Sequence, residues 1–164
     1  MKKLGIVFTL VILGFQFANA QLIKVVQEVF GMDCAPCAYG LERGLKKLDG
    51  LEKIVVSLND GKAYLTLASG NTVTLKKIQD EVKKNGFSAR NAKVIMIGDL
   101  NKVGNEWVMK VNNETFKMED RQSLNIKNLA SGLVKMSVEV ADEDDKQLSN
   151  NWAIKIIEIL ALER

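Results

Sequence analysis

The sequence predicts an α+β protein, and three observations support this prediction. Segments rich in β-branched residues alternate with segments in which apolar residues recur at helical spacing. Turn signals such as Asp49-Gly50, Asp60-Gly61 and Asn85-Gly86 separate these segments. The 164 residues, of which 47% are hydrophobic and 26% charged, suffice for one ordinary domain or two small ones.

Residues 22–97 are expected to form a strand, a helix, two strands, a second helix and a last strand. The first helix begins around Pro36, since proline suits a first helical turn, and the second begins after Thr74 as its N-cap. This order is the βαββαβ motif of ferredoxin-like folds, a four-stranded antiparallel sheet with both helices on one face. The helix faces expected to point inward carry Leu41, Leu45 and Leu48 in the first helix and Leu75, Ile78 and Val82 in the second.

Residues 98–164 are predicted to form a small β-rich C-terminal domain or an extension of the same sheet. Residues 98–105 are rich in Gly and Asn and indicate a linker or turn. Residues 134–140 alternate strictly between apolar and polar, which predicts a half-buried strand. Residues 152–160 favour a strand over a short helix because of their β-branched residues and tryptophan. Residues 93–97 can also pair with this region, which would fuse the two parts.

Two features of the C-terminal region invite a functional interpretation. Met96, Met109, Met118 and Met136 fall one per expected strand, and thioether sulfur is a soft copper ligand. Because their positions alternate inward, core packing is the favoured role. The acidic run 142–145 lacks the spacing and the glycine of an EF-hand, which favours a solvated turn over a calcium site.

The N-terminus predicts a signal peptide over residues 1–20. Lys2 and Lys3 precede the apolar run 4–17, which ends in Ala18-Asn19-Ala20, the small-x-small pattern of a cleavage site. An uncleaved membrane anchor is the alternative, but the run is short of the ~20 predominantly apolar residues that a span needs. We therefore expect an exported protein, periplasmic or extracellular, without stable membrane insertion after cleavage.

The composition excludes several functions. Because the chain has no histidine, Ser-His-Asp and Cys-His catalytic pairs and Cys2His2 zinc sites are excluded. The net charge of +3 is slight and the basic residues form no stripe, so nucleic acid is not expected as a partner. The two cysteines allow one disulfide or one dithiol site.

Cys34 and Cys37 stand where the first strand leads into the first helix. Unpaired N–H groups at a helix N-terminus stabilise thiolate, the form that binds metals or attacks disulfides. The two-residue spacing lets both sulfurs converge on one point. Metal binding, thiol–disulfide exchange and a structural disulfide are therefore all open to this pair.

The residues Gly31-Met32-x-Cys34-x-x-Cys37 resemble the heavy-metal-associated domain. This family includes small copper chaperones, the N-terminal modules of metal-exporting P-type ATPases and a periplasmic mercury-binding protein. The resemblance covers about residues 22–97 and implies the βαββαβ fold. Further residues typical of the family stand at Gly50-Leu51, Val55, Ala63, Thr74-Leu75 and Asn85-Gly86-Phe87.

The resemblance implies a role for each residue of the loop. Cys34 and Cys37 are implied as the metal ligands, and Met32 as a core residue that braces the loop. Phe87 matches a position that faces the metal, where an aromatic residue is typical of ATPase modules and the mercury protein. Asp33 matches a position that often holds Asp in zinc- and cadmium-exporting modules. Its carboxylate could supply a harder third ligand for Zn(II) or Cd(II).

The sequence therefore predicts a non-enzymatic metal-binding protein with one metal ion per chain. Two soft thiolates suit Cu(I), Hg(II) or another thiophilic ion, and Asp33 would favour Zn(II) or Cd(II). The ion would be sequestered or passed by thiolate exchange to a metal transporter or another cysteine-bearing partner. The alternative is an extracytoplasmic thiol–disulfide oxidoreductase, since Cys-Ala-Pro-Cys looks like a thioredoxin-type active site. Against it, such folds place a cis-proline opposite the cysteines, and this chain has only Pro36.

Overall fold

The computed structural model of the chain describes residues 20–118, 130–141 and 150–162. Of the predicted signal peptide, residues 1–19 lie outside the described residues, as does the acidic run 142–145. The elements in chain order are β1 (Gln21–Phe30), α1 (Ala35–Leu45), β2 (Leu51–Ser57), β3 (Lys62–Leu67), α2 (Leu75–Lys84), β4 (Ser88–Val103), β5 (Glu106–Val111), β6 (Glu114–Met118), β7 (Gly132–Val140) and β8 (Asn151–Leu160).

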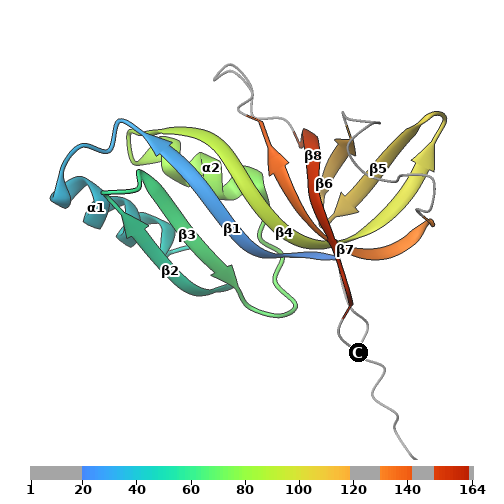
Figure 1. Cartoon of the computed structure of the whole chain (residues 1–164). Helices are drawn as coiled ribbons and strands as arrows, with labels where there is room; N and C mark the ends of the chain where they lie inside the picture. The colour runs from blue at the N-terminus through green and yellow to red at the C-terminus, as the bar shows by residue number, and fades with distance from the viewer. Residues whose placement is uncertain (1–19, 119–129, 142–149, 163–164) are drawn as a thin grey trace, which may run out of the picture.

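The first six elements confirm the predicted βαββαβ fold. Their strands lie in the order β2-β3-β1-β4, all antiparallel, and both helices cover one face of this sheet (Figure 1). The Oγ1 atom of Thr74 accepts a hydrogen bond from the backbone N–H of Lys77, which confirms Thr74 as the N-cap of α2. Neither helix of the described chain has the length and apolar character that crossing a bilayer would require.

The last four strands continue the sheet and close it into a barrel. One edge of β4 pairs with β1 along residues 88–97 and then with β5 along residues 99–103. The other edge of β4 pairs with β7 along residues 92–100. The ring runs β4-β5-β6-β8-β7 and back to β4, with β6 and β8 parallel and the other pairs antiparallel. The C-terminal region is therefore β-rich, as predicted, and it shares β4 with the first half.

The expectation of a linker or turn at residues 98–105 was wrong for most of that range. β4 continues to Val103, and the turn is confined to Gly104 and Asn105. Gly98 is buried inside the strand, where an added Cβ would lie 2.7 Å from the Sδ atom of Met109 and the Cγ2 atom of Val111. Gly98 therefore lies where β4 approaches the side chains of β5 closely. Such a close approach is a common reason for glycine within a strand.

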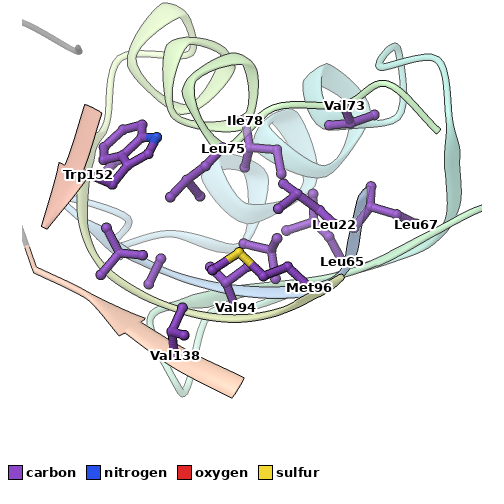
Figure 2. Close-up of a cluster of buried hydrophobic side chains, with 14 of the residues drawn as sticks. Leu22, Leu65, Leu67, Val73, Leu75, Ile78, Val94, Met96, Val138 and Trp152 are labelled. Atoms are coloured by element: carbon purple, nitrogen blue, oxygen red, sulfur yellow. The ribbon is translucent and has the colours of Figure 1, made fainter. Parts of the chain in front are cut away.

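One hydrophobic core extends through both halves. Figure 2 shows Trp152 of β8 in the same cluster as Leu75 and Ile78 of α2 and Val94 of β4. Residues 152–160 form a strand, as predicted, and the alternation of residues 134–140 is confirmed. The side chains of Met96, Met109 and Met136 are fully buried, in agreement with their favoured role as core residues.

A carboxylate of the barrel also fixes α2. Glu114 at the start of β6 is buried, and its two oxygens accept the backbone N–H groups of Leu75 (2.7 Å) and Lys76 (2.8 Å). Oε1 additionally accepts the indole N–H of Trp152 at 2.9 Å. The first turn of a helix leaves such N–H groups without helical partners, so Glu114 satisfies two donors of α2 from the other half of the chain.

Candidate metal centre

The cysteine loop connects β1 to α1 and is anchored at both sides. Gly31 has φ +89°, in the left-handed region that glycine adopts without strain, so the chain can turn sharply after Phe30. Met32 is only 5% exposed and belongs to the core. That Met32 braces the loop stays a prediction. Beyond the cysteines, Ala38 and Leu41 of α1 are buried and hold the first turn of the helix against the sheet.

The two cysteines form a disulfide across the first turn of α1. Cys34 is the N-cap of the helix, and its Sγ atom accepts the backbone N–H of Cys37 at 3.1 Å. Pro36 occupies the first turn, as the sequence predicted. Both cysteine side chains are partly exposed, while Ala35 and Pro36 between them are exposed. The sulfurs are therefore adjacent and close to the helix N-terminus, in two partly exposed residues of which Cys37 also packs against the core.

The other predicted site residues lie beside this pair but are not joined to it. Asp33 is exposed, and within residues 20–118, 130–141 and 150–162 no three Cys, Asp or Glu side chains come together as a metal site would require. Phe87 is half-buried and packs against the core. The pairing of Phe30 with Ser88 brings the α2–β4 connection alongside the cysteine loop. That Phe87 faces a bound ion stays a prediction.

The end of α2 is held in place next to the loop. Asn85 donates its side-chain amide to the carbonyl of Glu81 at 2.7 Å, and Gly86 has φ +89°, as a helix C-terminus favours. The backbone N–H of Phe87 donates to the carbonyl of Val82 at 3.2 Å. The backbone of the α2–β4 connection, which includes Phe87, is therefore fixed by hydrogen bonds to the last turn of α2.

The β2–β3 hairpin carries a titrating group, Asp60, with a shifted pKa. The backbone N–H of Val29 donates to the carbonyl of Gly61, which places this hairpin beside the end of β1. Hydrogen bonds with the Ser57 hydroxyl and then with the Tyr64 hydroxyl hold the pKa of Asp60 below its ordinary value. Asp60 is therefore a charged carboxylate at neutral pH, in a hairpin at the end of the sheet from which the cysteine loop leaves.

The core methionines are far from the cysteines. Met96 pairs with Leu22, whereas the loop follows Phe30 at the opposite end of β1. Eight strand residues separate these positions, or about 26 Å along the strand. The barrel also lies at the end of the molecule away from the loop (Figure 1). Met96 is therefore no ligand for an ion held by Cys34 and Cys37.

The sequence reasoning did not anticipate two arginines near the loop. Arg43 lies over the ring of Tyr39, and Arg90 lies over the ring of Phe30. The first pair has the i, i+4 spacing that brings helix residues together, and this spacing could have indicated it. The second pair depends on the register of β1 against β4, which no local pattern reveals.

Comparison with known families and proteins agrees with this site. Residues 26–88 match the Heavy-metal-associated domain. An uncharacterized protein of Haemophilus influenzae is 30% identical over 90 residues, which cover 54% of this chain and 96% of that protein. The probable copper-transporting ATPase HMA5 of Arabidopsis thaliana is 30% identical over 66 residues, or 40% of this chain. The match covers only 6% of that ATPase.

Solved structures resemble the first half of the chain. The copper binding domain from HMA7, a P-type ATPase, is 29% identical, covers 44% of this chain and 92% of that chain, and superposes with a TM-score of 0.39. The yeast copper transporter domain CCC2A is 27% identical over 41% of this chain and 90% of that chain, with a TM-score of 0.38. The CopZ metallochaperone is 23% identical over 40% of this chain and 97% of that chain, also with a TM-score of 0.38.

Proposed function

Since the chain belongs to the heavy-metal-associated domain family through residues 26–88, we propose that it captures a thiophilic metal ion with Cys34 and Cys37 and passes the ion on by ligand exchange. The observation that carries this proposal is the placement of both sulfurs side by side at the start of α1, in residues that are partly exposed. The ion is cargo, and its capture and release need no catalytic group.

The disulfide must open before a metal can bind. A thiol reductant supplies two electrons and two protons, and the resulting thiols lose their protons as the metal binds. The N–H of Cys37 already points at the Sγ atom of Cys34, and the positive end of the helix dipole lies at the same place. Both features stabilise the negative charge that a thiolate ligand carries.

The donor set favours a soft ion in low coordination. Because the described residues bring no third acidic or thiol side chain to the cysteines, the site offers two thiolates. Two soft sulfurs suit Cu(I), whereas Zn(II) takes four ligands and would need further donors. We propose Cu(I) as the preferred ion, with Hg(II) as a second thiophilic candidate.

For Zn(II) or Cd(II), we propose Asp33 as the third ligand, since its carboxylate is adjacent in sequence to Cys34. Replacing Asp33 by Thr would then weaken Zn(II) binding and leave Cu(I) binding unchanged. Competition titrations of the reduced protein with a chromogenic chelator for each ion measure this. Equal Zn(II) affinity of the two proteins would remove Asp33 from the site.

Transfer follows from the partial exposure of the two cysteines. An incoming thiolate of a partner bonds to the two-coordinate ion, and one cysteine thiolate then leaves and takes up a proton. Repetition of this step moves the ion completely without a change of oxidation state. A metal transporter or another cysteine-bearing protein is the proposed partner.

We also propose that the protein acts outside the cytoplasm, on the basis of the apolar run 4–17 and the cleavage pattern at residues 18–20. In an oxidising compartment the two cysteines return to the disulfide unless metal or a reductant protects them. Mass spectrometry of the protein from the exported fraction tests this. We expect a chain that begins at Gln21, whereas recovery of the intact chain in the cytoplasmic fraction would contradict it.

The direct test of metal capture is a titration of reduced protein with Cu(I), Hg(II) and Zn(II). We expect one Cu(I) per wild-type chain and none at comparable affinity in Cys34→Ser/Cys37→Ser. Tyr64→Ser serves as a control, because its hydroxyl bonds to Asp60 and not to the loop. Unchanged stoichiometry in the double serine variant would overturn the proposal.

The disulfide itself favours one second candidate, an exported thiol–disulfide oxidoreductase. Such an enzyme would reduce a substrate disulfide through a mixed disulfide and leave its own cysteines oxidised. Insulin reduction in the presence of a thiol reductant and a metal chelator separates the two functions. Turnover that depends on Cys34 under these metal-free conditions would support the oxidoreductase, and its absence would exclude it.

A further inference from the structure

The second half of β8 has one side that no other strand covers. β8 pairs with β6 through residues 151–154 and with β7 through residues 154–160. Beyond Ile154, only β7 pairs with β8 within the three described parts of the chain, so the opposite side of β8 is a strand edge. The backbone N–H and C=O groups that point away from β7 along residues 155–160 are available to a further strand.

The exposed side chains along this edge include two isoleucines. Ile157 is 47% exposed and Ile159 is 41% exposed. The edge strand at the other side of the sheet, β2, is covered instead, because Glu42 of α1 accepts the backbone N–H of Val56 there. Proteins that stay monomeric cover or block their strand edges. Exposed isoleucines along an unpaired strand therefore indicate that another chain pairs with it.

Two charged side chains of this half-strand lie on the same face of the sheet. Lys155 lies between Ile154 and Ile156, which are buried, so it points away from the core. Glu158 pairs with Ser137 of β7, both of whose neighbours in that strand are buried, so Glu158 also points away from the core. No ion pair joins Lys155 or Glu158 to another described residue.

The spacing of these two charges is complementary to itself. When two copies of β8 pair antiparallel about a two-fold axis midway between residues 155 and 158, Lys155 of each copy lies opposite Glu158 of the other. One dimer then contains the same ion pair twice. The same register places Ile156 opposite Ile157, so apolar side chains meet apolar side chains. The edge thus carries the pattern of a strand that pairs with a second copy of itself.

A local irregularity of β8 is compatible with this register. The pairing with β7 shifts between Ser137 and Val138, which leaves Ile157 as an extra residue without a partner in β7. Because both copies of β8 carry the extra residue at the same place, the pairing between the copies keeps a one-to-one register. The two bulges therefore lie beside each other at the axis.

We propose that two copies of this chain form a two-fold dimer by antiparallel pairing of residues 155–160 of β8. The sheet then runs from β4 through β7 and β8 of one copy into β8, β7 and β4 of the other. Backbone hydrogen bonds supply the affinity of the contact, and the two ion pairs fix its register. The dimer goes beyond the proposed metal transfer and does not depend on it, because the cysteine loop takes no part.

Sedimentation equilibrium of residues 21–164 tests the dimer. The oxidised protein is used with a metal chelator present, so that neither an ion nor thiol exchange can join two copies. We expect a monomer–dimer equilibrium with a Kd of about 1–100 µM, as a small interface allows. A protein that stays monomeric at ~0.5 mM overturns the proposal.

Charge reversal tests the register. Glu158→Lys places lysine opposite lysine twice in each dimer, and Lys155→Glu places glutamate opposite glutamate twice. Each substitution should weaken dimerisation at least ~10-fold. The exchange variant Lys155→Glu/Glu158→Lys restores opposite charges and should dimerise within ~3-fold of the wild type, which also shows that neither substitution prevents folding. An exchange variant as weak as the single variants overturns the proposal.

Matched controls come from the other edge of the sheet. Glu52 and Lys53 are exposed residues of β2. Glu52→Lys and Lys53→Glu make the same charge changes as the two single variants of β8 and should leave the Kd unchanged. A dimer that is weakened equally by the substitutions in β2 and β8 responds to net charge alone, and this result overturns the proposal.

Chemical cross-linking identifies the contact independently of any substitution. A carbodiimide converts an ammonium and a carboxylate in direct contact into an amide. The reaction is carried out on a mixture of unlabelled and isotope-labelled protein. We expect mass spectrometry to find Lys155 of a labelled chain joined to Glu158 of an unlabelled chain, and the reverse. A dimer whose cross-links between chains all lie elsewhere overturns the proposal.

Discussion

Two glycines of α1 illustrate how single residues fix the position of the metal loop. Gly44 is buried, and an added Cβ would overlap the side-chain amide of Asn85, which caps the end of α2. Gly40 lies one turn earlier in the helix and has open space where a Cβ would be. The close approach at Gly44 is what lets α1, with Cys37, pack against the end of α2.

Replacing Gly44 by Ala should therefore destabilise the protein by about 1–2 kcal/mol, even though alanine is the better helix former. The amide of Asn85 must move and lose its hydrogen bond to the carbonyl of Glu81. Gly40→Ala is the matched control and should stabilise the protein by about 0.5–1 kcal/mol. Urea unfolding of the three proteins measures both effects. Equal changes in the two variants would contradict the packing argument.

The cysteine residues were predictable from local sequence, and their surroundings were not. The spacing of Cys34 and Cys37, the proline between them and Met32 all indicated the loop, and the structure places them as expected at the start of α1. The stack of Arg90 on Phe30 joins residues 60 positions apart and depends on the pairing of β1 with β4. Local patterns carry no information on such register.

At the scale of elements, α2 depends on a side chain that lies far away in the sequence. Its N-cap Thr74 was predictable, but no local pattern connects Glu114 with the helix. Without Glu114, the buried backbone N–H of Leu75 and the partly buried N–H of Lys76 would both lose their acceptor. Glu114→Ala should therefore cost about 2–4 kcal/mol of stability. Urea unfolding tests this, and a loss below about 1 kcal/mol would show that water or another side chain replaces the carboxylate.

The same carboxylate predicts a pH dependence. Burial raises the pKa of Glu114 above its ordinary value of 4.5, although the hydrogen bonds from Lys76, Leu75 and Trp152 oppose this shift. Because the folded-state pKa is the higher one, the folded protein binds this proton more tightly than the unfolded chain. The stability that comes from protonation of Glu114 is therefore fully present below pH 4.5 and is lost as the pH rises through the folded-state pKa.

Glu114→Gln removes this titration and isolates its effect. The stability of the wild type relative to Glu114→Gln should increase as the pH falls from 7 toward 4.5. Unfolding in urea at several pH values within that window gives the difference between the two proteins. A difference that stays constant, or that moves in favour of the variant at low pH, would contradict the assignment.

β2 is an open edge of the sheet, and α1 protects it. Glu42 accepts the backbone N–H of Val56 through Oε2 and the ammonium of Lys46 through Oε1. The hydrogen bond from Lys46, followed by that of Val56, holds the pKa of Glu42 below its ordinary value despite partial burial. Free strand edges invite pairing with other chains, so a helix side chain on this N–H reduces that tendency.

For the whole molecule, the shared strand β4 joins the two halves into one sheet. The βαββαβ order was predictable because each of its elements carries its own pattern and turn signals. Barrel closure was not, because it depends on the pairing of β4 with both β5 and β7. Gly98 resembled a linker residue, and the proximity of Met109 and Val111 of β5 explains its presence in a strand.

A fragment of residues 21–103 should consequently be much less stable than residues 21–164. The fragment lacks Glu114 and Trp152 and exposes the face of α2 that they cover. We expect a loss of more than about 3 kcal/mol in the free energy of unfolding, from the missing cap and the exposed apolar area. Far-UV circular dichroism in urea compares the two proteins. The same unfolding midpoint would show that the first half folds independently of the barrel.

The central claim is that Cys34 and Cys37 alone hold the ion, and X-ray absorption at the copper edge tests it most directly. The spectrum of Cu(I)-loaded, reduced protein, purified free of small thiols, reports the number and type of ligand atoms. We expect two sulfur neighbours in near-linear geometry and no such signal in Cys34→Ser/Cys37→Ser. Oxygen or nitrogen ligands without sulfur, or an unchanged spectrum in the serine variant, would contradict it.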